Sequence, residues 1–419
     1  MAVSVSNKVL SLRSAFSYSA IESIGSRVFD FFTLWIVLNT LNTEDLAKFG
    51  VVTSTIFFFN LIFFAPETAL FRYYKEWKEN NKLNDYLSSY FKFSLFKLLV
   101  HYVSILFVFL YLGAEHWLLY AIVFSAITQH IQCAEISRIY LRLSLQQNLV
   151  ARFEIKSKLA LCALCVFLFY KSSITIYFGI YFLWSFIISL FWLKKINNSC
   201  TLSNNSLYKV KEDVLHSLIR FSVWTHISGA LIYFIYNSNL LFLNYYSSSI
   251  EEVAMYTAVN KVANLFFVIP MFFQSFVPVV LASEGDASTK FNKLILVCAL
   301  LSVGQFVFFA LFGHFLGTFF GVEEVNISSF YELGLILSFG VLLLNLTRPI
   351  STYLLITASP KNVMLFVYIP SSIFALILYN IATSKFASLG AATASAIIYF
   401  YMAISLCVMF YNQKSKSYD

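Results

Sequence analysis

The chain has 419 residues, of which 59% are hydrophobic and 12% are charged. Because soluble domains carry about 25% charged residues, this composition and the mean hydropathy of +0.74 exclude an ordinary soluble protein and indicate a polytopic membrane protein. The net charge of +8 follows membrane topology, so we expect no nucleic-acid partner. Cys162 and Cys165 lie in an apolar segment without a second pair or a flanking His, so neither a metal site nor a redox role is predicted.

Twelve segments are apolar enough to span a bilayer, for which about 20 residues are needed. In chain order they are 14–40, 46–74, 86–112, 116–141, 150–170, 174–193, 216–244, 252–281, 291–320, 329–357, 362–382 and 386–411. The longest polar segment is rich in Asn and Ser, as flexible linkers are. We therefore predict an all-α membrane protein with an N-terminal six-helix lobe (1–193), a cytoplasmic linker (194–215), a C-terminal six-helix lobe (216–411) and a cytoplasmic tail (412–419).

The basic residues are distributed unevenly between the two ends of these spans. Of the 29 Lys and Arg residues, 23 fall on one side, three fall on the other and three lie within spans. Since Lys and Arg are enriched on the cytoplasmic side of membrane proteins, both termini are expected in the cytoplasm. That orientation requires an even number of spans, in agreement with twelve.

The first span carries ionisable side chains near its middle. At 100° per residue, Glu22, Arg27 and Asp30 share one face with several Ser and Thr residues, while most aromatic residues lie outside it. A cation at the centre of a membrane helix costs roughly 2.5–3.5 kcal/mol on insertion scales, so this face is expected to line a hydrated passage. The alternative is that Arg27 and Asp30, one turn apart, only neutralise each other between helices.

Two more cations, Lys261 and Arg348, fall within predicted spans. An Arg fork suits bidentate contact with a phosphate, and Lys presents a point charge. Asn264 lies one turn from Lys261 and favours a hydrated face there. The alternatives are that Lys261 extends to the membrane surface and that Arg348, which precedes Pro349, anchors a kinked helix near the interface.

The seventh span has a polar face of its own, which includes His226 and Tyr233. Tyr rings can stack on sugar faces, and His titrates near neutral pH; packing and hydrogen bonding inside the protein explain these residues equally well. Glu22 and Asp30 are candidates to bind a coupling ion, H⁺ or Na⁺, or merely balance Arg27. The motifs for ATP binding, zinc proteolysis and serine hydrolysis are missing, so the sequence predicts neither an enzyme nor a cofactor.

The two halves of the chain are similar to each other. Phe-Ser begins the first span at 16–17 and the seventh at 221–222. After a two-residue insertion, Glu-Asp-Leu-Ala-Lys-Phe at 44–49 matches Glu-Glu-Val-Ala-Met-Tyr at 251–256. Because each half has an even number of spans, these are parallel repeats related by an axis along the membrane normal, with a substrate site expected between them.

The first span, the turn Leu-Asn-Thr-Glu-Asp-Leu-Ala-Lys-Phe-Gly at 41–50 and the aromatic helix after it resemble polysaccharide flippases of the multidrug/oligosaccharidyl-lipid/polysaccharide (MOP) superfamily. Asn-Thr at 42–43 replaces their commoner Ser-Pro, and one extra residue precedes Phe49. The stretch from Arg348-Pro349 to Ser-Pro-Lys at 359–361 resembles their connection between the tenth and eleventh helices. The twelve spans and basic residues most resemble the O-antigen (Wzx-type) flippases of bacterial surface-polysaccharide clusters.

This resemblance implies a V-shaped pair of six-helix lobes that work by alternating access in the bacterial inner membrane. The implied substrate is an undecaprenyl-pyrophosphate-linked oligosaccharide, moved from the cytoplasmic to the periplasmic leaflet during lipopolysaccharide or other surface-glycan synthesis. The implied partners are membrane lipid, a coupling ion, and a polysaccharide polymerase with its chain-length regulator. Basic cavity residues are common in the first and eighth helices of such flippases, which points to Arg27 and Lys261.

Two other functions stay open at this point. An ion-coupled multidrug or cation antiporter of the same superfamily would favour an acidic central cavity, whereas in the cavity expected here three cations face two acids, Glu22 and Asp30. A polysaccharide polymerase or ligase would carry a large periplasmic loop, and every predicted periplasmic loop is short.

Overall fold

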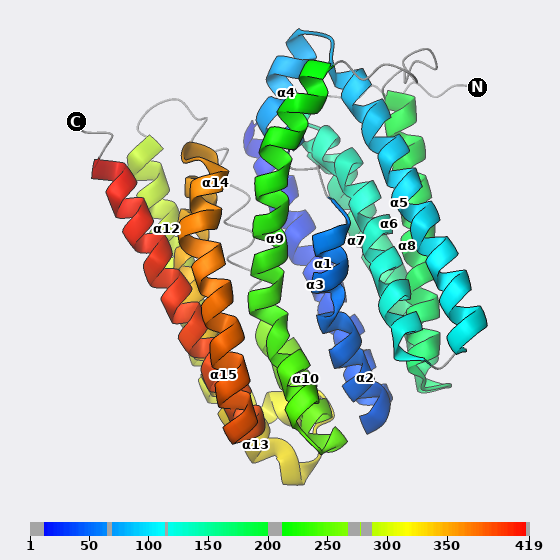
Figure 1. The fold of residues 1–419 in the computed structure, drawn as a ribbon, viewed down its shortest axis with the longest axis vertical. Helices are drawn as coiled ribbons and strands as arrows, with labels where there is room; N and C mark the ends of the chain where they lie inside the picture. Colours follow the sequence, from blue (N-terminus) through cyan, green and yellow to red (C-terminus); the bar gives the residue numbers. More distant parts are fainter. Residues whose placement is uncertain are drawn as a thin grey trace. The chain divides into compact units, whose positions relative to one another are not determined.

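The structure is a computed structural model that describes residues 12–64, 69–113, 116–199, 212–266, 277 and 287–415 (Figure 1). These residues form helices joined by short connections, and they include no strand. The end of the span predicted at 252–281, most of the predicted linker and the end of the predicted tail lie outside them. The expectation of an all-α chain is confirmed.

The N-terminal half begins with a long helix, α1 (Leu12–Thr40), and continues through shorter ones. These are α2 (Thr43–Ser54), α3 (Ile56–Ile62) and α4 (Ala69–Glu79). Four longer elements complete this half: α5 (Leu83–Leu112), α6 (Trp117–Leu143), α7 (Gln147–Cys165) extended by the 3-10 turn η1 (Val166–Phe169), and α8 (Ile174–Ser199).

The single span predicted at 46–74 is divided into α2, α3 and α4. Three consecutive hydroxyl residues stand where α2 ends. Thr53 and Ser54 both donate to the carbonyl of Gly50, at 3.0 and 2.9 Å, and Thr55 donates to that of Val52 at 2.7 Å. Side-chain donors that compete for carbonyls of the preceding turn bend helices, which accounts for the interruption between α2 and α3.

The C-terminal half contains α9 (Glu212–Tyr246), α10 (Ile250–Leu265) and α12 (Ala287–Phe319). They are followed by the turn η3 (Glu324–Asn326), α13 (Ile327–Thr357), α14 (Pro360–Val363), the π-helical turn η4 (Met364–Tyr368) and α15 (Ile369–Ser415). The spans predicted at 362–382 and 386–411 meet inside α15 at Ala387, where φ is 45° and ψ is −124°. A Cβ on Gly390 would lie 2.0 Å from the carbonyl oxygen of Ala382, so this sharp corner requires glycine.

Seven helical stretches among the described residues are long and apolar enough to cross a membrane. They are Thr43–Ile62, Leu83–Leu112, Trp117–Leu143, Ile174–Ile196, Thr289–Phe319, Glu324–Leu355 and Pro360–Gln413, the last containing both arms of α15. Many large apolar side chains on them are exposed, as with Leu110 and Leu311, which is the surface expected against lipid rather than water. The chain is therefore a multi-pass membrane protein.

The chain divides into two compact units. Unit 1 comprises Met1–Ile36 and Phe59–His226, and unit 2 comprises Val37–Phe58 and Ile227–Asp419. Buried aromatic residues such as Trp77 and Tyr86 form the core where α4, α5, α6 and α8 meet in unit 1. In unit 2, Tyr379 and Tyr399 belong to a core built from α9, α13, η4 and α15. The boundaries predicted for the lobes and linker stay a prediction.

Within unit 2, α2 and α10 begin alike and pack against each other. Asn42 caps α2 by accepting the amide of Asp45 at 2.8 Å, and Ser249 caps α10 by accepting the amide of Glu252 at 3.2 Å. The two caps are 207 residues apart, which is the offset of the sequence repeat.

The same offset relates Gly50 to Thr257, and these two residues meet where α2 and α10 cross. A Cβ on Gly50 would lie 2.0 Å from Oγ1 of Thr257. A contact between corresponding residues of two repeats is what a local twofold axis through the crossing would produce. The crossing therefore agrees with the parallel repeats predicted from the sequence.

Candidate functional site

The two acidic residues of α1 are neutralised by basic residues of α6 and α7. Glu22 is 7% exposed and accepts a hydrogen bond from Arg142 of α6 at 2.5 Å. Asp30 accepts one from Lys158 of α7 at 2.8 Å. The sequence predicted both acids as polar residues of this face, but it did not identify either partner.

The pairs around Glu22 extend into a chain of charges within unit 1. Arg142 also contacts Glu135 at 3.1 Å. Arg138 in turn contacts Glu135 at 2.6 Å and Glu154 of α7 at 2.9 Å. Removing one member of a buried ion pair is strongly destabilising because it leaves an uncompensated charge. These residues therefore hold α1, α6 and α7 together.

Helical spacing was the signal that could have revealed this network. Glu135, Arg138 and Arg142 lie three and four residues apart on one face of α6, and Glu154 and Lys158 are four apart on α7. Asp30, the partner of Lys158, lies 18 residues into α1, or roughly 27 Å along it.

Arg27 differs from the other basic residues of this network. Its side chain is 44% exposed, against 19% for Lys158, and one guanidinium nitrogen lies 3.4 Å from Asp30. Arg27 and Asp30 thus form the pair in which they would neutralise each other. The shorter contact of Asp30, however, is with Lys158. Two cations share one carboxylate here, so Arg27 is the least neutralised cation of this network.

Lys261 provides a second cationic position, in unit 2. Its ammonium donates to Oγ1 of Thr53 at 2.7 Å and lies 5.0 Å from the ring centroid of Phe49, so both neighbours are on α2. In the part of the chain that the structure describes, Lys261 has no carboxylate partner. Asn264, one turn further along α10, donates to Asn260 at 3.5 Å.

Thr53 connects Lys261 to the polar face of α9. Its hydroxyl accepts from Lys261, while its carbonyl accepts from the hydroxyl of Tyr233 at 3.1 Å. The sequence predicted Lys261 and Tyr233 separately, and the structure brings them together through a residue that it missed. The Thr53 hydroxyl already donates to Gly50 and the Tyr233 hydroxyl to Thr53, so it is the ammonium of Lys261, with three N–H donors, that has the capacity to bind an oxyanion or a sugar.

Arg348 and His226 have other surroundings. The guanidinium of Arg348 lies 5.1 Å from the ring centroid of Tyr236, and both line a cavity of about 40 Å³ with Thr347, Ser351 and Tyr368. His226, in unit 1, contacts the carbonyl of Leu61 at 3.2 Å and packs against the ring of Phe64. These contacts favour the packing alternative for His226.

No protein-family profile matches the chain, and no curated protein is significantly similar to it. Solved structures match nearly its whole length. An outward-facing multidrug resistance MATE family transporter of the MOP superfamily aligns with a TM-score of 0.65 at 16% identity, covering 96% of each chain. An inward-facing MATE family transporter aligns with a TM-score of 0.57 at 14% identity, covering 97% of this chain and 96% of the other.

A third match is a MOP superfamily transporter from Pyrococcus furiosus. It aligns with a TM-score of 0.65 at 14% identity over 96% of each chain, and it is described as having a binding pocket of reverse polarity that suggests a different function. The chain therefore has an all-α fold similar to that of these MOP superfamily transporters, and the predicted fold class, an all-α membrane protein, is confirmed. The resemblance to this superfamily is supported at the level of the fold.

Proposed function

We propose that the protein is a flippase that carries an undecaprenyl-pyrophosphate-linked oligosaccharide from the cytoplasmic to the periplasmic leaflet by alternating access. The fold supports a transporter rather than an enzyme. The observation that carries the substrate class is Lys261, whose ammonium has a hydroxyl and an aromatic ring as neighbours but no carboxylate among the described residues.

The energetics of burial favour an anionic substrate. A cation inside a membrane protein costs several kcal/mol unless a partner compensates it, and a visiting pyrophosphate would supply that partner. Arg27 adds a half-exposed guanidinium that shares its only carboxylate contact among the described residues with Lys158. Arg348 is a third candidate, and the Tyr233 ring is suited to stack on a sugar.

The second candidate is the ion-coupled drug antiporter, favoured by the MATE family transporters among the structural matches. A cationic drug needs an available carboxylate. Glu22 and Asp30 already accept from Arg142 and Lys158, so these bases would have to be displaced first. The same pairs bear on coupling: H⁺ or Na⁺ at either acid would compete with a basic side chain.

Complementation of a flippase-deficient bacterial strain tests the proposal. Arg27→Ala and Lys261→Ala should each abolish surface polysaccharide at protein levels matched to wild type. Arg27→Lys should keep part of the activity and Lys261→Arg should be tolerated better than Lys261→Gln, because charge matters before geometry. Lys385→Ala is the matched control, since Lys385 is an exposed lysine, and should behave as wild type.

Normal polysaccharide from the double variant Arg27→Ala/Lys261→Ala would overturn the proposal. Export of a cationic dye by the wild-type protein, lost in Asp30→Asn but kept in that double variant, would establish the antiporter instead.

A further inference from the structure

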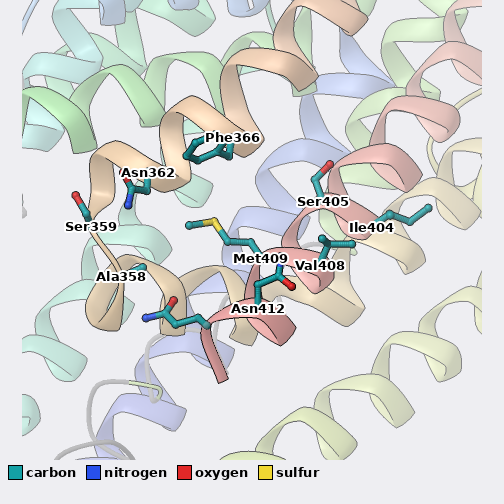
Figure 2. Close-up of a pocket in the computed structure, with 10 residues that line it drawn as sticks. Ala358, Ser359, Asn362, Phe366, Ile404, Ser405, Val408, Met409 and Asn412 are labelled. Atoms are coloured by element: carbon teal, nitrogen blue, oxygen red, sulfur yellow. The ribbon is translucent and has the colours of Figure 1, made fainter. Parts of the chain in front are cut away.

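A groove of about 640 Å³ opens in unit 2 where α13 ends, beside α14, η4 and the last turns of α15 (Figure 2). Its volume is within the range of about 300–1,000 Å³ that is usual for small-molecule sites. It is separate from the contacts of Lys261 and from the small cavity at Arg348, whose lining residues it does not share.

Along both walls of the groove, the lining residues change from polar to apolar in the same direction. Polar residues line one end, namely Ser359 and Asn362 on one wall and Asn412 and Gln413 on the other. Phe366 continues the first wall, and Ile404, Val408 and Met409 continue the second (Figure 2). Ser405, which lies among the latter, donates its hydroxyl to the carbonyl of Tyr401 at 2.9 Å, within its own helix. The lining thus changes from polar at the end near Gln413 to apolar near Ile404. This change takes seven to nine residues, or roughly 10–14 Å of helix.

The apolar end is open to the side. Phe366 is 69% exposed and Val408 is 54% exposed. In a protein that spans a membrane, such side chains face hydrocarbon. The π-helical turn η4 sets the register of Phe366 in this wall; π-helical turns are frequent at functional sites.

Basic residues accompany the polar end of the groove in the sequence. Lys361 is exposed beside Asn362, and Lys414 and Lys416 follow Gln413 in the sequence. The sequence has no acidic residue from 333 to 418. Basic residues next to a membrane attract anionic lipid, each by about 1 kcal/mol.

We propose that this groove binds one phospholipid with an anionic headgroup. The phosphate lies among the Ser and Asn side chains at the lysine-bearing end, and an acyl chain lies along Phe366 and Val408. The gradient matches the step from headgroup to hydrocarbon within one leaflet, and the local charge selects an anion. This site is independent of the proposed substrate.

Native mass spectrometry of the full-length protein, purified in mild detergent and offered phosphatidylglycerol or phosphatidylcholine, tests the inference. Wild type should retain one phosphatidylglycerol at least fivefold more than phosphatidylcholine. Val408→Trp, which fills the apolar end, should lose both lipids, and Lys361→Glu, at the exposed surface, should lose only the preference. Ile397→Trp is the matched control, because Ile397 is an exposed residue of the same helix outside the groove, and should bind as wild type.

Unchanged retention in Val408→Trp would overturn the site. Equal retention of the two lipids by wild type would overturn the headgroup assignment, and preferential retention of a polyprenyl phosphate would assign the groove to the substrate class instead. The thermal stability of each variant is measured beside that of wild type, so that a folding defect is recognised. If Val408→Trp is unstable, the lipid preference of Lys361→Glu decides whether the groove binds an anionic headgroup.

Discussion

At the scale of the residue, charge pairing separates two kinds of intramembrane ionisable groups. Glu22 and Arg142 are largely buried and contact each other across α1 and α6, so their role is to hold helices together. Arg27 shares Asp30 with Lys158, and Lys261 has no carboxylate partner among the described residues; in the proposed function their charges bind the substrate. The two kinds predict different consequences of mutation.

Glu22→Gln should lower stability, because it leaves Arg142 with fewer negative neighbours in a buried position. Breaking a fully buried pair costs roughly 3–5 kcal/mol; the loss here should be smaller, because the Arg142 side chain is 30% exposed and keeps Glu135, but the melting temperature of the purified protein should fall. The double variant Glu22→Leu/Arg142→Met should recover much of this loss, since apolar residues of similar volume can replace a buried pair.

Arg27→Ala is the comparison for that experiment. It should leave the melting temperature close to wild type, because its side chain is 44% exposed and Asp30 keeps its contact with Lys158. If Arg27→Ala lost as much stability as Glu22→Gln, Arg27 would belong with the residues that hold helices together.

At the scale of the element, the crossing of α2 and α10 depends on one small residue. Gly50 allows Thr257 to approach so closely that any side chain at position 50 would overlap it. Lys261 and Thr53 lie one turn further along the same pair of helices and join them by a hydrogen bond. The position of Lys261 is therefore set by the fit between these helices.

Gly50→Thr should impair flippase complementation, because overpacking a tight contact costs about 1–3 kcal/mol and separates the helix pair. Adding Thr257→Gly should restore activity, since across a local twofold axis the small residue and the larger one can exchange places. Gly229→Thr is the matched control, as nothing lies within 4 Å of a Cβ there. If the double variant is no better than Gly50→Thr alone, the twofold packing is wrong.

At the scale of the whole molecule, the asymmetry of Lys and Arg predicts the orientation in the membrane. Reporter fusions after Asn205 and at Asp419 should both report the cytoplasm, and fusions near Glu115 and Glu323 should report the periplasm. The measurement is the paired activity of a cytoplasmic and a periplasmic reporter at each position. A periplasmic carboxy terminus would contradict the even number of spans.

Composition and apolar run length alone determined the class of protein and most of its helices. The span predicted at 86–112 corresponds to α5 at Leu83–Leu112, and 116–141 corresponds to α6 at Trp117–Leu143. Such agreement is expected because the thickness of the bilayer sets the length of each apolar run. The repeat was also readable, since the capping residues of α2 and α10 keep their spacing.

The partners of the charged residues were decided only by the tertiary structure. Arg142 reaches Glu22 across 120 positions of sequence, and Lys261 reaches Thr53 across 208. Hydropathy and helical periodicity describe one helix at a time, so they identify which face is polar but not which other helix neutralises it. That outcome depends on how helices pack, and it is why Lys158 could be recognised as the partner of Asp30 only once α1 and α7 were seen together.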